Sequence, residues 1–262
     1  MSVGAVDIDG VRIERVDQVL HVTLSSPANR NAQTPATWRR LASAVDFVTP
    51  DVRAVVLTGD GASFSAGLDR QMLSPEGIAG EESLLTLAAH DNEVIDRFIR
   101  GAQSAFSWWS DTPVITIAAV QGHAIGAGFQ LALACDLIIA ADDAQFAMRE
   151  TSLGLVPDLT GTSRLVSRVG YSRALEICAS GRFVSAEEAV TYGIAIEQSL
   201  VGQLAARTQA LVASVLTAPA GAVRELKMLL RAAEVNSPID QHRAERISQI
   251  NRLAELRGVL QG

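Results

Sequence analysis

The chain has 262 residues, of which 48% are hydrophobic and 19% are charged, and its formal net charge is −7. This apolar content is enough for a large core, which excludes intrinsic disorder as the main description. An acidic chain with no run of Lys or Arg is also a poor candidate for a nucleic-acid-binding protein. We expect no metal site, because the four histidines are scattered, and we expect Cys135 and Cys178 to be buried, reduced thiols.

Residues 1–10 contain no Lys or Arg, and no apolar segment of the signal-peptide type follows them. The segment 112–135 is uncharged and about as long as a membrane span, but proline, glycine and glutamine residues interrupt it. A buried strand, a glycine turn and a buried helix explain this segment better. We therefore expect a cytoplasmic protein that makes no membrane contact.

Strands and helices alternate along the first two thirds of the chain. In chain order we predict a hairpin of strands 11–16 and 19–24, a helix 35–48, a strand 52–58, a mobile connection 74–91, a helix 93–109, a strand 114–120, a helix 129–135, strands 137–141 and 144–148, and a helix 159–169. The last third is predicted to be helical, over 173–180, 186–192, 201–216, 220–233 and 239–256. This order is typical of an α/β core followed by a helical region.

Two glycine-containing turns each follow a predicted buried strand and are expected to enter a helix. The first is Phe64-Ser65-Ala66-Gly67-Leu68-Asp69, and the second runs from Gly122 to Gly128 with the sequence GHAIGAG. Backbone N–H groups at the start of a helix are unpaired, and two of them aimed at one oxygen would stabilise an oxyanion. The alternative, that the glycines only let a helix pack close to a strand, stays open at this point.

Five motifs, taken in order, resemble the crotonase (enoyl-CoA hydratase/isomerase) family. They are the first turn, the second turn preceded by Pro113-Val114-Ile115, the segment Ala134-Cys135-Asp136-Leu137, the segment Leu153-Gly154-Leu155-Val156-Pro157, and Gly181-Arg182 followed by Ala186-Glu187-Glu188-Ala189. The similarity covers the chain from about residue 10 to residue 200. Its specificity lies in the order and spacing of the motifs, since any one of them alone is weak evidence.

The resemblance implies a crotonase-like spiral of repeated ββα units in residues 1–200. It also implies a helical oligomerisation region in residues 201–262, which would build a homotrimer or a dimer of trimers. The substrate would be an acyl-CoA thioester with no separate cofactor, because coenzyme A is part of the substrate. The N–H groups of Leu68 and Ala127 would form the oxyanion hole. The other positions that the resemblance assigns to substrate binding are Ala28, Arg30, Ala32, Ser65, Ala66, Gly67, Asp69 and Gly126.

The carboxylates indicate which reaction to expect. Hydration in this family uses two glutamates, which align with Gln130 and Glu150 of this chain. An amide cannot accept the proton of water, so standard hydration is expected to be slow. One carboxylate, Glu150, is enough to move a proton from C2 to C4 of an acyl chain, as in the enoyl-CoA isomerases. Asp158 resembles the second acid of the dienoyl-CoA isomerases and is a further catalytic candidate.

Several alternatives remain at the level of the sequence. Asp158 could cap the helix predicted from residue 159, and Gln130 could be a polar residue satisfied by the backbone. The protein could be a hydratase in which Gln130 positions water. It could also be a non-catalytic acyl-CoA-binding protein, in which Glu150 would pair with Arg149 or Arg164. Two departures from the family are the absence of a basic residue at Ala28 and of an aromatic-plus-lysine pattern in residues 252–257.

Overall fold

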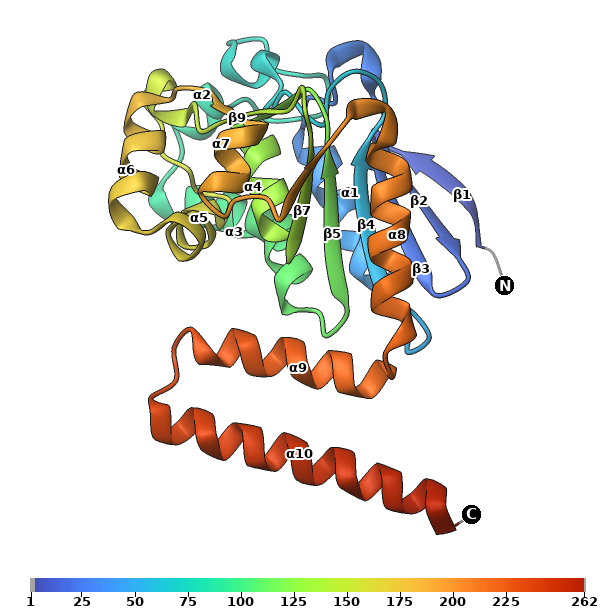
Figure 1. The fold of residues 1–262 in the computed structure, drawn as a ribbon. Helices are drawn as coiled ribbons and strands as arrows, with labels where there is room; N and C mark the ends of the chain where they lie inside the picture. Colours follow the sequence, from blue (N-terminus) through green and yellow to red (C-terminus); the bar gives the residue numbers. More distant parts are fainter. Residues whose placement is uncertain (1–2, 262) are drawn as a thin grey trace.

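The computed structural model describes residues 3–261, and the side chains of residues 6–257. Two sheets and the surrounding helices make up the structure (Figure 1). The large sheet has the strand order β1-β2-β3-β4-β5-β7-β10 and the small sheet the order β6-β8-β9. The strands are β1 (Val3–Ile8), β2 (Val11–Val16), β3 (Val19–Leu24), β4 (Ala54–Gly59), β5 (Ile115–Val120), β6 (His123–Ile125), β7 (Leu137–Ala141), β8 (Gln145–Ala147), β9 (Val184–Ser185) and β10 (Glu197–Ser199).

Helices surround the two sheets and extend the chain at its C-terminal end. They are α1 (Pro35–Ser43), α2 (Leu84–Leu87), α3 (Asn92–Asp111), α4 (Ala127–Ala134), α5 (Gly161–Val169), α6 (Tyr171–Ser180), α7 (Ala186–Thr191), α8 (Leu204–Thr217), α9 (Ala220–Ala233) and α10 (Pro238–Gln261). Short 3₁₀ helices include η2 (Ala44–Phe47), η3 (Arg70–Leu73) and η4 (Glu150–Leu153). Most predicted elements are found within a few residues of their expected bounds.

The N-terminal hairpin has the predicted bounds, and β2 and β3 pair antiparallel from Val11 opposite Leu24 to Val16 opposite Val19. β1 was not predicted from the sequence. It pairs with β2 at the sheet edge, where Val6 and Ile8 stay more than 40% exposed, so it lacks the buried alternation that marks an inner strand.

Two further predictions need correction. The first glycine turn does not enter an α-helix, because the chain forms only the four-residue 3₁₀ helix η3 after it. The second turn is not all turn, since residues 123–125 form strand β6 of the small sheet. The connection 74–91 contains the short helix α2.

The ββα repeat accounts for the small sheet. β5 continues into β6 and then α4, and β7 continues into β8 and then η4. Each unit therefore gives one parallel strand to each sheet. β4 is followed in the same way by Ser65, which makes a parallel bridge to Ala124. The expected fold of repeated ββα units is confirmed, and it brings the segments after β4, β5 and β7 together.

The large sheet is covered on both faces, which explains the nearly continuous apolar sequences of its central strands. In β4, Val55 and Leu57 pack into the main core, while Ala54 and Val56 face the other way. The second face packs against Val212 of α8, and the main core lies between the sheet and helices that include α1, α3 and α4. Figure 1 shows α8 lying along the sheet on this second face.

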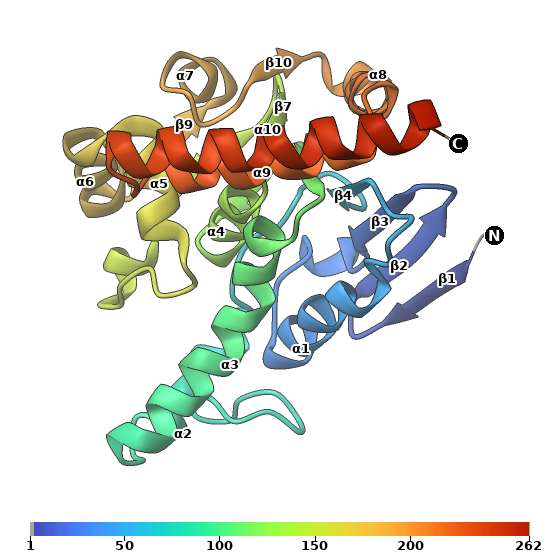
Figure 2. The same cartoon turned by 90° about the horizontal axis from the view of Figure 1, so that it is seen from below.

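The helices α9 and α10 lie side by side below the rest of the molecule (Figures 1 and 2). Lys227 of α9 attaches them to the body. Its ammonium group is buried and donates to Asp136 Oδ2 at 2.7 Å and to the backbone oxygen atoms of Trp109 and Val114. Asp136 in turn accepts from the backbone N–H and the hydroxyl of Thr116. Within residues 3–261, no helix is both long enough and apolar enough to cross a membrane.

Candidate active site

The two glycine turns are held against each other by backbone hydrogen bonds. Ser65 N–H donates to His123 O at 2.8 Å, and Ile125 N–H donates to Ser65 O at 3.0 Å. Gly67 has a φ of +88°, and a Cβ atom there would lie 2.4 Å from Ile125 O. Only glycine fits this close approach without strain. The same hypothetical Cβ would lie 3.5 Å from Ala127 N, so the turns bring residues 67 and 127 together.

The N–H groups of Leu68 and Ala127 are both available for a ligand. Ala127 is the first residue of α4, so its N–H has no acceptor within the helix. The N–H groups on either side of Leu68 are engaged, since Gly67 donates to Ser65 Oγ and Asp69 to Gln33 O. Within residues 3–261 neither the Leu68 nor the Ala127 N–H donates to another group of the protein. Two N–H groups without a protein acceptor on adjacent turns supply the donors that an oxyanion hole requires.

Two buried amide side chains that sequence reasoning missed hold the first turn in place. Gln33 accepts from Trp38 Nε1 at 2.9 Å and donates to Ser65 Oγ at 3.0 Å. Asn31 donates to the backbone oxygen atoms of Asp60 and Ser63. Both residues lie in a polar loop, where nothing in the sequence distinguishes a buried amide from an exposed one.

The loop predicted to bind the substrate lies beside the first turn. Ala66 N–H donates to Arg30 O at 2.8 Å, and the Arg30 side chain is exposed. Ala28 is exposed on the same loop, and Ala32 is half-buried. Asp69 acts locally as a cap, since its Oδ1 accepts from Gln71 N–H at the start of η3.

The carboxylate of Glu150 lies against the second turn. A Cβ atom at Gly126 would be 3.2 Å from Glu150 Oε1 and 3.8 Å from Oε2. Oε1 accepts from Gln130 Nε2 at 2.7 Å, whereas Oε2 is buried and has no partner among the described residues. Burial raises the pKa of Glu150, and the nearby charge of Asp158 adds to this. The side chain therefore lies beside the second turn, and its Oε2 atom is not turned to bulk solvent.

The side chain of Gln130 is buried in α4, and its polar atoms are in use. Oε1 accepts from Leu159 N–H at 2.9 Å and from Gly161 N–H at 3.3 Å, while Nε2 donates to Glu150. Gln130 thus connects the start of α5 to the candidate catalytic carboxylate. The alternative that Gln130 is a polar residue satisfied by the backbone is confirmed for its Oε1 atom, whereas its contact with Glu150, 20 residues away in the sequence, was not predicted.

The interpretation of Asp158 as a helix cap is wrong. α5 begins at Gly161, its N-cap is Thr160 with a φ of +66°, and no side chain caps it from that position. The N–H groups of Leu159 and Gly161 donate to Oε1 of Gln130 instead. The Asp158 backbone is held by Gln103, whose Nε2 donates to Asp158 O at 2.7 Å, and burial raises the pKa of the Asp158 carboxyl.

The arginines expected to neutralise Glu150 in a binding-only protein have other partners. Arg164 donates to Ser110 Oγ, and the guanidinium of Arg149 lies over the ring of Phe183. Of the other expected features, Cys135 is buried as predicted but Cys178 is only partly buried. Within the described residues, no group of His, Cys, Asp and Glu could hold a metal ion.

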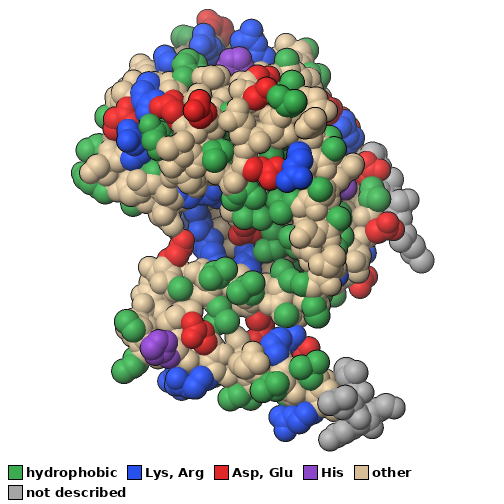
Figure 3. All heavy atoms as spheres, viewed as in Figure 1, with side chains coloured by type: hydrophobic (Ala, Val, Ile, Leu, Met, Phe, Trp, Pro, Cys, Tyr) green, Lys and Arg blue, Asp and Glu red, His purple; other side chains and the backbone are tan. Residues whose placement is uncertain are grey.

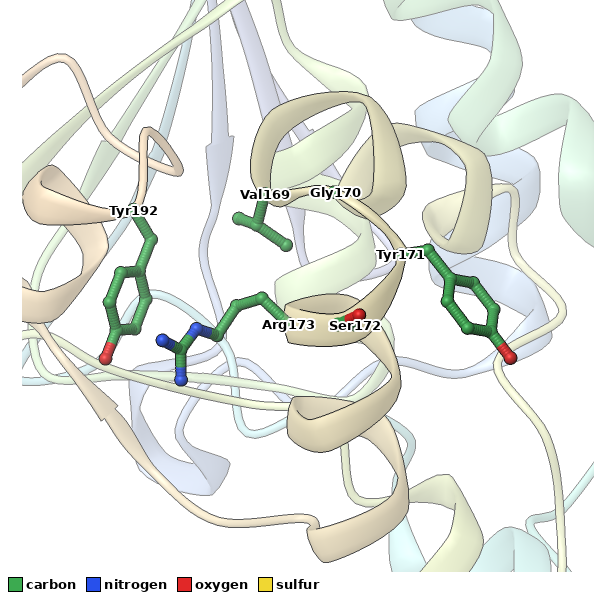
Figure 4. A pocket seen from close by; sticks show the side chains of 6 residues that line it. All are labelled: Val169, Gly170, Tyr171, Ser172, Arg173 and Tyr192. Atoms are coloured by element: carbon green, nitrogen blue, oxygen red, sulfur yellow. The ribbon is translucent and has the colours of Figure 1, made fainter.

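An open hollow of about 670 Å³ at the junction of α5 and α6 is separate from these residues (Figure 4). Arg173 stacks on the ring of Tyr192 at 4.3 Å, and Tyr171 points away from this pair. None of the predicted site residues lines this hollow.

Comparison with known proteins identifies the family. The model of the enoyl-CoA hydratase/isomerase family matches residues 14–252. The chain belongs to the enoyl-CoA hydratase/isomerase family. The expected resemblance is therefore confirmed, and the chain is an enzyme of the crotonase superfamily.

Solved structures of this family share the whole fold. A protein of Thermobifida fusca YX, assigned as an enoyl-CoA hydratase and solved in complex with acetoacetyl-CoA, is 43% identical with a TM-score of 0.90. The match covers 94% of this chain and 96% of that chain. An enoyl-CoA hydratase from Polaromonas sp. JS666 is 29% identical with a TM-score of 0.84, covering 95% of this chain and 93% of that one.

Two relatives matched by sequence alone cover a smaller part of this chain. The 2,3-dehydroadipyl-CoA hydratase of Escherichia coli K12 is 34% identical over 70% of this chain and 66% of that protein. A probable enoyl-CoA hydratase of Bacillus subtilis is 33% identical over 68% of this chain, and the match spans 65% of that relative's length.

Proposed function

We propose that this enzyme binds an acyl-CoA thioester and moves a double bond along its acyl chain through an enolate. One observation carries the proposal: among the described residues, one buried carboxylate oxygen of Glu150 has no partner and lies near Gly126, and the Leu68 and Ala127 N–H groups donate to no protein group. A protein that only binds its ligand has no need of such an oxygen, because burying an unpaired carboxylate oxygen costs stability.

The reaction follows from these groups. Glu150 takes a proton from C2 of a 3-enoyl thioester, and the electron pair left behind passes to the thioester oxygen. The Leu68 and Ala127 N–H groups donate to that oxygen as it becomes negative. Glu150 then returns the proton to C4 while the double bond forms between C2 and C3. We propose Asp158, on the loop before α5, as a second acid and base for an extended diene substrate.

Acyl-CoA is the proposed substrate because the Thermobifida fusca relative was solved with acetoacetyl-CoA bound, and its fold matches almost the whole of this chain. The exposed loop with Ala28, Arg30 and Ala32, together with residues 65–67, Asp69 and Gly126, is proposed to receive the coenzyme and the thioester. No separate cofactor is needed for this chemistry.

Hydration is the second candidate, since several relatives are named enoyl-CoA hydratases. It would require Gln130 to position water while Glu150 alone exchanges protons. Gln130 Oε1 already accepts two backbone N–H groups, which leaves it no free lone pair for water. Isomerisation is therefore favoured. Turnover of crotonyl-CoA by the native chain, with little gain in Gln130→Glu, would favour hydration instead.

The proposal is tested with a 3-enoyl-CoA in D₂O. We expect the wild type to exchange hydrogen at C2 and to form the 2-enoyl product. Glu150→Gln should lower both rates by a factor of about 10² or more, because general base catalysis contributes that much. The measurement is mass spectrometry and NMR of the recovered thioester.

The matched control is Glu187→Gln, which removes an exposed carboxylate of α7 and should leave the rates unchanged. Full exchange in Glu150→Gln would contradict the role of Glu150. Tight binding of the thioester without any exchange in the wild type would favour the binding-only alternative.

We also propose a homotrimer or a dimer of trimers, because apolar side chains are exposed along the two C-terminal helices (Figure 3). Those more than 50% exposed include Leu226, Met228, Leu230, Ile239, Ile250 and Leu256, and Val235 in the connection between the two helices is exposed as well. A monomer would leave this surface in water. The cytoplasm stays the predicted compartment.

A further inference from the structure

We infer that Gln130 is a positioning residue that holds Glu150 by Oε1 and leaves Oε2 as the one oxygen that exchanges a proton with the acyl chain. The inference rests on the proposed function, in which Glu150 carries that proton. It gives Gln130 a role other than positioning water.

The hydrogen-bond directions fix which atom of Gln130 faces Glu150. Two backbone N–H groups, those of Leu159 and Gly161, donate to one end of the Gln130 amide, so this end is the oxygen. The other end is the NH₂ group, which donates to Glu150 Oε1 at 2.7 Å. Oε1 uses a lone pair to accept this hydrogen bond, so it is the less favourable of the two sites for the carboxyl proton. The proton of neutral Glu150 therefore resides on Oε2.

The position of Oε2 fits this assignment. It is buried and has no partner in the described part of the chain, so it is available to a bound substrate. Both carboxylate oxygen atoms lie near Gly126, directly before Ala127, whose N–H is free. Oε2 would lie 3.8 Å from a Cβ atom at Gly126, so the proton-carrying oxygen lies near the place where the thioester oxygen would be held.

The choice of glutamine also affects how easily Glu150 ionises. A donated hydrogen bond stabilises the charged carboxylate and lowers its pKa, which opposes the effect of burial. The titratable groups that face Glu150 are Asp158, on the loop before α5, and Cys178 of α6; Arg149, just before Glu150, is stacked on Phe183. A glutamate at position 130 would set a second negative charge against Oε1 and make ionisation harder.

Two variants separate this positioning role from a purely structural one. Gln130→Met removes both the donor to Glu150 and the acceptor of the α5 N–H groups. Gln130→Glu keeps an acceptor for Leu159 and Gly161 but loses the donor. Gln103→Met is the matched control, because it frees the same loop at Asp158 O without touching Glu150.

The first measurement needs no substrate. Titration of the δ-carbon of ¹³C-labelled glutamate by NMR, with Glu150→Gln to assign the signal, gives the midpoint of Glu150. We expect the midpoint to rise by about one pH unit in Gln130→Met, since a hydrogen bond to a charged group is worth about that much. It should rise further in Gln130→Glu and stay unchanged in Gln103→Met.

The second measurement is the pH profile of C2 exchange. In each Gln130 variant the acid limb should move upward by as much as the Glu150 midpoint of that variant, and kcat should fall about tenfold or more at neutral pH while KM changes less than about twofold. Gln130→Glu should remain folded, with a cooperative unfolding transition, while its profile moves. Unchanged midpoints in both variants would overturn the inference, even if the wild type is active. Absence of exchange in the wild type would instead refute the proposed function.

Discussion

At the scale of the residue, Glu150 is held in an environment that opposes its charge. Burial raises its pKa, and one of its oxygen atoms has no partner among the described residues. The pKa of such a carboxyl group is higher in the folded state than in the unfolded state. Its ionisation therefore lowers the free energy of unfolding as the pH rises from the unfolded pKa through the folded pKa. At pH values above the folded pKa of Glu150, the reduction in the free energy of unfolding is complete.

We therefore expect Glu150→Gln to be more stable than the wild type at neutral pH, by about 0.5 to 2 kcal/mol, the usual gain when a strained active-site group is relieved. The substituted amide oxygen can still accept from Gln130. The gain should shrink as the pH falls below the unfolded pKa, where wild-type Glu150 is neutral in both states. Chemical denaturation at several pH values measures this. A variant less stable than the wild type at neutral pH would show that the carboxylate is well solvated.

At the scale of the element, the site depends on how closely two turns approach. The turn after β4 and the turn around β6 are joined through Ser65, and Gly67 lets the first turn lie against Ile125 O. The N–H groups proposed to form the oxyanion hole come from these two turns, so the separation of the turns sets the distance between the two donors. The approach of the two turns depends on the absence of a side chain at Gly67.

Gly67→Ala tests this dependence. Because the new methyl group would lie 2.4 Å from Ile125 O at a positive φ, the turns must separate. We expect a loss of about 2–3 kcal/mol in the free energy of unfolding and a fall in exchange of about 10² or more.

Gly101→Ala, in the middle of α3 where a Cβ meets nothing within 4 Å, is the control. It should keep full activity and gain about 0.5–1 kcal/mol. A Gly67→Ala enzyme with normal activity would show that the two turns do not form the hole.

At the scale of the whole molecule, the C-terminal helices stand apart from the body. Lys227 and Asp136 hold α9 to it through a buried ion pair with further hydrogen bonds. Figure 3 shows Lys and Arg side chains in the recess between the body and α9, together with apolar side chains along α9 and α10. One such residue is Ile250, which is 61% exposed.

Sedimentation or light scattering should give a particle of three or six times 27.7 kDa, since these apolar surfaces are expected to be covered by other copies of the chain. Ile250→Glu should shift the particle toward a monomer at micromolar concentration. A wild-type protein that remains monomeric at high concentration would contradict the proposed assembly.

The amino-acid sequence was enough to predict the family and the order of most of the elements. Its β-branched hairpin, buried strands and helical last third follow local periodicity, and the glycine turns with Glu150 carry the resemblance. The hydrogen-bond partners of the buried polar side chains are known only from the tertiary structure. Gln130 contacts the start of α5 and Glu150, and Gln33 supports Ser65, across distances in sequence that no local pattern records. Local periodicity reports which face of an element is buried, but hydrogen bonds between buried polar groups depend on which segments the fold brings together.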